Sequence, residues 1–201
     1  MGDPALQRLT YAEYLQLEQD TGEKYEWRQG FAVAMSGGTL THAQLAVRLI
    51  GTLYGRLRGK PCQPWNSDAK VRIPAEDVST YPDISVVCGE PIRDTLDRNT
   101  ITNPTVLFEI LSESTENYDR AEKFAYYRAL PTFRDYVLVS QHEVAIDHFE
   151  RRADGSWLFR QLGAGDVLNL KSIKLRFKIA EIYAGVPLET RTSRLKPRPI
   201  A

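Results

Sequence analysis

Two carboxylates in the middle of the sequence have a type and a setting that suit metal-assisted chemistry. Asp83 follows Pro82 and opens the apolar run "ISVVC", and Glu109 lies inside the apolar run "VLFEIL". A buried, unpaired carboxylate is costly or is driven to take up a proton. We therefore expect a compensating cation beside Glu109.

A divalent ion would satisfy both acids if the two apolar runs form neighbouring strands. The carboxylates would then project toward one point near the end of the sheet, where their repulsion favours a cation between them. Mg²⁺ prefers such oxygen ligands and keeps positions for water and a substrate phosphate. It also lowers the pKa of a bound water. With a lysine nearby, these parts match a metal-dependent phosphodiesterase.

Each acid also has a structural interpretation. Pro-Asp at the start of a strand is common turn chemistry, so Asp83 alone indicates little. Glu109 could pair with Arg120 or Arg128 and simply hold a helix against the sheet. Ser112, directly after the strand, is interpreted as the beginning of a helix rather than as a nucleophile, because no nucleophile-elbow pattern surrounds it.

The pattern of apolar residues predicts the elements that must position these acids. Thr10 and Glu13 form a capping box at the start of a helix over 10–20. A hairpin over 24–36 turns at Gln29-Gly30. The longest helix, over 37–60, has Thr39 or Thr41 as its N-cap and a leucine at every fourth position. The other predicted elements are strands over 69–74, 81–88 and 105–111, a helix over 114–130 that begins at Ser114 or Thr115 and ends at Pro131, and strands over 133–140, 143–150, 156–162 and 167–170.

The composition is typical of a globular chain, and its net charge favours neither nucleic acid nor a membrane surface as a partner. Of 201 residues, 42% are hydrophobic, and 26 Lys and Arg balance 26 Asp and Glu. We expect one domain over 1–185, followed by a basic, proline-containing tail over 186–201 that is loosely ordered or binds a partner. No apolar run approaches the roughly 20 residues of a membrane span, so no membrane association is predicted. The sparse cysteines predict a reducing, cytoplasmic location.

The two cysteines do not form a metal-binding or disulfide pattern. Cys62 and Cys88 are far apart in the sequence and belong to no Cys/His cluster. The sequence therefore predicts neither a disulfide framework nor a zinc site, and Cys88 is interpreted as a small buried hydrophobe.

Several stretches together resemble a known protein family. They are "GEKYEWRQGFAVAMSGGTLTHAQLAVRL", "YPDISVV", "PTVLFEILSEST", "DRAEKFAYYRAL" and "FRDYVLVS". They are similar to the bacterial Uma-type family of restriction endonucleases, within the PD-(D/E)XK nuclease superfamily, over about residues 8 to 185. The resemblance implies an α/β (mixed α+β) fold with a restriction-endonuclease-like core: a mixed central sheet flanked by helices, an additional N-terminal hairpin and C-terminal antiparallel strands. It also implies DNA as the substrate and Mg²⁺ as the cofactor, with Mn²⁺ as a substitute.

The active-site lysine departs from the pattern of the superfamily. The pattern puts a lysine two residues after the acid, where this chain has Leu111. The resemblance suggests that the lysine lies on the following helix, which makes Lys123 the candidate. Lys70, in Asp68-Ala69-Lys70, is kept in reserve, because its spacing fits but the strand that follows looks alternating and partly exposed.

The resemblance also assigns Glu26 to the site as an assisting acid. By periodicity alone, Glu26 is only the polar neighbour of Tyr25 and Trp27 in the hairpin. His42, at the start of the long helix, could contact phosphate or act as a general base; the alternative is a capping or surface histidine.

Contacts with DNA and with a second chain are less well defined. Basic side chains on the long helix could bind phosphates, or could simply be a solvated helix face. These are Arg48, Arg56, Arg58 and Lys60, and the tail adds Arg191, Arg194, Lys196 and Arg198. A homodimer is predicted, because duplex cleavage needs two cuts. Its proposed surfaces are the hairpin with Tyr25, Trp27 and Phe31 and the strands around Trp157 and Phe159.

The sequence thus favours a Mg²⁺-dependent DNA endonuclease with Asp83, Glu109, Lys123 and Glu26 in its active site. Asp83 and Glu109 would hold the metal. The alternative is a module on the same scaffold that binds nucleic acid or protein without cleaving it. The missing lysine at position 111 and the balanced net charge favour that alternative.

Overall fold

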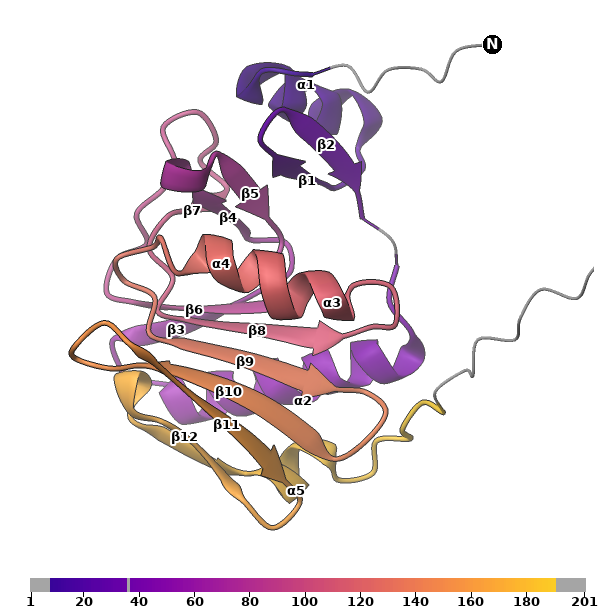
Figure 1. Ribbon diagram of the computed structural model, residues 1–201, viewed down its shortest axis with the longest axis vertical. Helices are drawn as coiled ribbons and strands as arrows, with labels where there is room; N and C mark the ends of the chain where they lie inside the picture. The colour runs from indigo at the N-terminus through magenta and orange to yellow at the C-terminus, as the bar shows by residue number, and fades with distance from the viewer. Residues whose placement is uncertain (1–7, 36, 191–201) are drawn as a thin grey trace, which may run out of the picture.

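Two large β-sheets, a smaller sheet of two strands and the helices packed on them form the described part of the chain, and the predicted mixed α/β class is confirmed (Figure 1). The structure is a computed structural model that describes residues 8–35 and 37–190. None of the helices within these ranges combines the length and the apolar composition that a membrane crossing requires.

The central sheet has six strands and carries both predicted acids. In spatial order it contains β11 (Trp157–Gly163), β10 (Ala145–Arg151), β9 (Asp135–Ser140), β8 (Val106–Leu111), β6 (Ile84–Cys88) and β3 (Cys62–Asn66). Strands β8 and β9 are parallel, and the other pairs are antiparallel. The predicted mixed sheet is therefore present, and the strands of Asp83 and Glu109 are neighbours.

The predicted N-terminal hairpin belongs to a second sheet of five strands. Its order is β2 (Phe31–Ala34), β1 (Tyr25–Arg28), β5 (Val78–Thr80), β4 (Lys70–Ile73) and β7 (Thr100–Ile101). Strand β4 is buried at all four positions, so the expectation of a partly exposed strand after Asp68 is wrong. The sequence did not reveal β5 and β7, which are too short to show a period.

The capping box and the hairpin turn form as predicted. Thr10 and Glu13 cap helix α1 (Tyr11–Thr21), and Gln29 and Gly30 make the turn with positive φ angles. Trp27 is only 2% exposed, because it packs against aromatic rings of α1. The hairpin surface predicted for a dimer therefore does not include Trp27.

The alternation of side chains along β8 divides the core into two layers. Phe108 and Ile110 pack with the leucines of α2 (Leu40–Leu57), whose N-cap is Thr39. Leu107 and Leu111 pack on the other face with α4 (Phe124–Tyr127). Figure 1 shows α2 behind the sheet and α3 with α4 in front of it. Glu109 shares the second face, so its side chain points toward the α3–α4 segment.

The single helix predicted over 114–130 is interrupted. It consists of α3 (Glu116–Tyr118), a π-helical turn η2 (Asp119–Lys123) and α4. Neither predicted cap forms a side-chain cap bond, and the Ser112 hydroxyl instead accepts a hydrogen bond from the Thr115 backbone N–H. Ser112 thus opens the turn that leads into α3, as expected. Because π-helical turns concentrate at functional sites, this segment is the first place to look for chemistry.

The C-terminal part of the described chain packs its apolar side chains into the same core cluster as the leucines of α2. It contains β12 (Val167–Leu170), a 3₁₀ turn η3 (Lys171–Ile173), β13 (Leu175–Lys178) and α5 (Ile179–Tyr183). Val186 joins the core, and Thr41 donates a hydrogen bond to the Pro187 carbonyl. Residues 191–201 of the predicted tail, with Arg191, Arg194, Lys196 and Arg198, lie outside the described residues.

Cys62 and Cys88 form a disulfide, so the prediction of unpaired cysteines is wrong. They are directly opposite each other on β3 and β6. No sequence pattern indicates this pairing, because the separation of 26 residues matches no recognised spacing. The bond ties an edge strand to the strand that follows Asp83.

Reduction of this disulfide is expected to destabilise the protein. In the chain-entropy description, closing a loop of this length contributes about 3 kcal/mol to the free energy of unfolding. Urea unfolding with and without a reducing agent should show that loss in the native chain, and none in a Cys62→Ala/Cys88→Ala variant. Two free thiols in the native, unreduced protein would contradict the pairing.

Candidate active site

The pairing of β6 with β8 brings Asp83 beside Glu109. Ile84 is opposite Phe108, so Asp83, one residue earlier, lies next to Glu109. The Ile110 backbone N–H donates a hydrogen bond to Asp83 Oδ2 at 2.7 Å, and the Asp83 N–H lies 3.4 Å from Glu109 Oε2. The two acids meet where the sequence placed them, at the end of adjacent strands.

His42 reaches the same point from the start of α2. Its Nε2 lies 3.1 Å from Asp83 Oδ2, so it is neither a cap nor a surface histidine. Burial lowers the pKa of His42, but the hydrogen bond to Asp83 and the charge of that carboxylate outweigh burial and raise the pKa above its ordinary value. A Cβ at Gly38 would lie 2.9 Å from the His42 ring, so the glycine makes room for the imidazole.

Lys123 comes from the π-helical turn and lies among three carboxylates. Its Nζ is 3.1 Å from Glu109 Oε1, 3.2 Å from Glu26 Oε1 and 3.1 Å from Asp119 Oδ1. These acids belong to β8, β1 and the π-helical turn itself. One ammonium group thus joins both sheets to the helix between them.

Two further groups bind the carboxylates of this cluster. Arg28, two residues from Glu26 on the same face of β1, places its Nη2 2.6 Å from Glu26 Oε2. The hydroxyl of Tyr127, one helical turn after Lys123, donates a hydrogen bond to Glu109 Oε1 at 2.9 Å. Sequence reasoning missed Asp119 and Tyr127, although they lie four residues before and after Lys123, a spacing typical of one helix face.

The cluster holds more negative than positive charge. Glu26, Asp83, Glu109 and Asp119 face two permanent cations, Lys123 and Arg28. Burial raises the pKa of Glu109 well above its ordinary value. The attraction of Lys123 opposes this shift, and the neighbouring carboxylates add to it. For Lys123, burial lowers the pKa, but the three carboxylates outweigh burial and raise the pKa well above its ordinary value.

A cavity of about 300 Å³ gives access to the cluster. Its walls include Glu26, Arg28, Tyr118 and Lys123, together with the end of β2 and Ser114 and Thr115 before α3. The Arg28 guanidinium stacks 3.6 Å from the centre of the Tyr118 ring. The cavity thus opens onto Lys123, Arg28 and Glu26, whereas Asp83 and Glu109 are not among the residues that line it.

The reserve lysine and the structural alternatives for Glu109 are placed elsewhere. Lys70 is buried and forms ion pairs with Glu18 and Asp97, away from Asp83. Arg120 pairs with Glu116 and Asp147, and Arg128 lies over the Phe124 ring. Glu109 is therefore not held by an arginine.

The basic residues of α2 lie away from the cluster. Arg56 is 14 residues beyond His42, which corresponds to about 21 Å along the helix, and it pairs with Glu181. Arg58 and Lys60 follow it at the exposed end, and Arg48 lies beside Gly185. Of the predicted nucleic-acid contacts on α2, only His42 is at the site.

The acids fit a magnesium ion better than a metal with an all-protein ligand set. Within residues 8–35 and 37–190, no group of three or more His, Cys, Asp or Glu side chains has the arrangement of a metal site. Mg²⁺, however, commonly uses one or two carboxylates and completes its sphere with water and substrate phosphate. In these same ranges Asp83 Oδ1 makes no hydrogen bond, and Glu109 Oε2 receives only the long contact from Asp83, so two oxygens remain for an ion.

A solved structure shares this fold. It is a protein of Anabaena variabilis ATCC 29413 described as "a putative nuclease belonging to DUF820". The match has a TM-score of 0.66 and 14% identity, and covers 81% of this chain and 90% of that one. The two chains therefore share a mixed α/β fold.

The chain belongs to the Uma2 family, whose sequence profile, described as "Putative restriction endonuclease", matches residues 11–180. Two uncharacterized proteins of Synechocystis sp. (strain ATCC 27184 / PCC 6803 / Kazusa) are similar to it. One is 42% identical over 179 residues, covering 89% of this chain and 93% of the relative. The other is 31% identical over 154 residues, covering 77% and 87%. The recognised family is thus confirmed, whereas the homodimer and the cytoplasmic location stay predictions.

Removal of the Lys123 charge is expected to destabilise the fold strongly. Lys123→Met would leave three buried carboxylates without their shared cation, at a cost of about 3–5 kcal/mol in the free energy of unfolding. Lys171→Met is the matched control, because the Lys171 side chain is 63% exposed in its ion pair with Glu150. Equal unfolding midpoints in urea for the two variants would contradict this account of the cluster.

Neutralisation of Glu109 is expected to stabilise the protein at alkaline pH. Because the folded state raises the pKa of Glu109, its contribution to stability is present below its ordinary pKa of 4.5 and is lost as the pH rises through the raised value. In EDTA at alkaline pH, Glu109→Gln should therefore raise the melting temperature by about 2–4 °C.

The exposed neighbour Glu122 supplies the control for this prediction. Glu122→Gln should leave the dependence of the melting temperature on pH unchanged. A native chain that stays more stable than Glu109→Gln across the alkaline range, without metal, would show that the Glu109 charge is fully compensated by Lys123.

Proposed function

We propose that the protein is a Mg²⁺-dependent DNA endonuclease that hydrolyses phosphodiester bonds at the Asp83–Glu109 site. The observation that carries the proposal is the convergence of these two acids beside a lysine, with an excess of negative charge around them. Membership of the Uma2 family supports a nuclease, and its description supports DNA as the substrate.

The ion would lie between Asp83 and Glu109. When bound, Mg²⁺ supplies a water of lowered pKa and stabilises charge on the phosphate. Mn²⁺ would serve as a substitute, because it also accepts oxygen ligands. The Ile110 N–H and His42 fix one oxygen of Asp83, so its other oxygen would be available to hold the ion.

Lys123 would orient the attacking water and offset the charge that develops on the phosphate. Its ammonium donates to Glu109 and lies against Glu26 and Asp119, so one of these contacts must yield to the water. Glu26 would assist by holding Lys123 near Glu109, since its other oxygen is bound by Arg28. His42 would position Asp83 and contact the phosphate.

A second function is supported by the same cluster. The Lys123 ammonium is surrounded by three carboxylates, and position 111 carries no lysine. A site whose lysine is fully engaged could bind nucleic acid or protein without cleaving it. The two functions differ in whether added Mg²⁺ produces broken strands.

Cleavage of supercoiled plasmid tests the endonuclease directly. The native chain should produce nicked and linear DNA with Mg²⁺ or Mn²⁺ and none with EDTA. Asp83→Asn and Glu109→Gln should each lower the rate at least about a hundredfold, because each removes one of the two charges that hold the ion. The rates are measured from the decay of the supercoiled band.

Metal binding must be measured alongside cleavage. Calorimetric titration should detect Mg²⁺ or Mn²⁺ binding to the native chain and to Glu122→Gln, and no binding to Asp83→Asn. DNA binding without strand breaks and without a bound ion would favour the second function. Cleavage that persists in both acid variants would place the chemistry elsewhere.

A further inference from the structure

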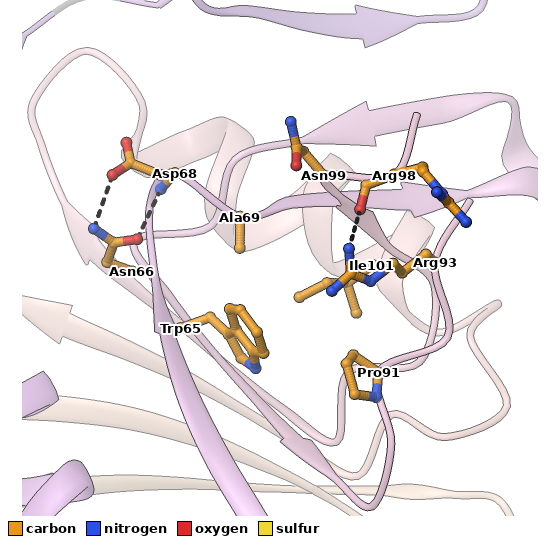
Figure 2. A pocket seen from close by; sticks show the side chains of 9 residues that line it. All are labelled: Trp65, Asn66, Asp68, Ala69, Pro91, Arg93, Arg98, Asn99 and Ile101. Atoms are coloured by element: carbon orange, nitrogen blue, oxygen red, sulfur yellow. Dashed lines mark hydrogen bonds between the residues drawn. The ribbon is translucent and has the colours of Figure 1, made fainter. Parts of the chain in front are cut away.

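A pocket separate from the acid cluster lies beside β7, the last strand of the five-stranded sheet. It has a volume of about 420 Å³, in the range of small-molecule sites. Figure 2 shows the rings of Trp65 and Pro91 on two sides of one hollow, with the Ile101 side chain lining the wall between them. Trp65 is 36% exposed, whereas Ile101 is almost fully buried. The pocket thus offers an accessible aromatic face over a fixed apolar wall.

The strand that carries Trp65 is the neighbour of the strand that follows Asp83. Trp65 is opposite Ser85, and Ser85 is opposite Leu107, so Trp65 projects from the same face of the six-stranded sheet as Leu107 and Glu109. Two residues and one strand spacing separate Trp65 from Asp83, which corresponds to about 8 Å between their Cα atoms. The pocket and the acids are therefore supported by adjacent strands.

Arg93 provides the polar group of the pocket. In Figure 2 its guanidinium lies near Ile101, and Nη1 donates a hydrogen bond of 3.3 Å to the Arg98 carbonyl. The backbone of Arg93 is bridged to Ile101, and Asn103 accepts a hydrogen bond from the neighbouring Ile92 N–H. The donor is thus held by a fixed loop rather than by a free chain end.

The charge of Arg93 is not neutralised by the pocket. Asp68, the only acid on the wall, is bonded to Lys24 and to the Asn66 amide. Across the described parts of the chain, neither Arg93 nor Arg98 lies within ion-pairing distance of a carboxylate. The guanidinium of Arg93 can therefore donate hydrogen bonds to a ligand that carries acceptor atoms.

We propose that this pocket binds an unpaired guanine base of the DNA strand whose backbone reaches the Asp83–Glu109 site, an inference that rests on the proposed function. The base stacks on the Trp65 indole, and the Arg93 guanidinium donates to the O6 and N7 acceptors of guanine. The apolar wall of Ile101 and Pro91 covers the rest of the ring.

The chemistry of the pocket favours a base over a phosphate. A phosphate site would gather several cations, but the Arg98 side chain extends away from Trp65 in Figure 2, which leaves one guanidinium beside a largely apolar wall. A planar base can stack on the Trp65 ring, and two adjacent acceptors on that base can each accept a hydrogen bond from the planar Arg93 guanidinium. Among the bases, guanine presents that pair of acceptors.

Binding of a labelled oligothymidine with one central guanine tests the inference. The full chain is used in EDTA, so that binding is measured without cleavage, and the oligonucleotide has about a dozen residues. Fluorescence anisotropy should show that the guanine oligomer binds about tenfold more tightly than plain oligothymidine. Arg93→Ala should abolish this preference, and Trp65→Ala should weaken binding of both oligomers about tenfold.

Three controls separate base recognition from general attraction. Arg98→Ala should change affinity less than twofold, and Arg93→Ala should leave the salt dependence of binding unchanged, because its contact is not with phosphate. Trp65→Phe should keep the guanine preference but lose the quenching of indole fluorescence on binding. This conservative variant also serves if Trp65→Ala fails to fold.

Four outcomes would overturn the inference. They are the absence of a guanine preference, an equal loss in Arg93→Ala and Arg98→Ala, unchanged binding by Trp65→Ala, and binding of free dGMP as tight as that of the oligomer. The last would assign the pocket to a mononucleotide instead.

The result is independent of the cleavage experiment. A chain that shows the guanine preference but never cuts plasmid DNA retains the base pocket and loses the endonuclease. A chain that cuts DNA while Trp65→Ala and Arg93→Ala bind and cut normally retains the endonuclease and loses the base pocket.

Discussion

The Lys123 ammonium group is the interaction on which the arrangement of the site depends. It contacts carboxylates from β1, β8 and the π-helical turn, and all four side chains are almost completely buried. Each carboxylate would be prohibitively costly in this position without a nearby cation. The ammonium thus fixes how the five-stranded sheet, the six-stranded sheet and the α3–α4 segment meet, and the cavity lies at that junction.

One lysine cannot balance the acids around it, and this imbalance connects stability with function. The excess charge is relieved by a proton on Glu109 or by a cation near Asp83, and these two solutions compete for the same oxygens. A site designed only to hold the sheets together would contain equal numbers of acids and bases, since unpaired buried charge weakens the fold. In the proposed function, this excess of negative charge would favour the binding of a divalent ion.

Periodicity and local rules predicted the elements, but not the way in which they meet. The leucines of α2 and the apolar runs of β6 and β8 are long enough to show which faces are buried, so the two acids could be placed on neighbouring strands. The π-helical turn that brings Asp119 to Lys123 depends on packing against both sheets, which no local pattern encodes. The same holds for the disulfide, because the opposition of Cys62 and Cys88 follows from strand register.

The position of the lysine follows from the way the strand is covered. Leu111, two residues after Glu109, projects to the same face but packs in the apolar cluster with Tyr127 and Leu130. A lysine there would lie beneath the helix and would have to displace core side chains, whereas Lys123 approaches Glu109 from the helix itself. The ammonium therefore reaches the same acid from the layer above the sheet. Its position is therefore set by the helix rather than by the strand, and it lies at the end of the π-helical turn Asp119–Lys123.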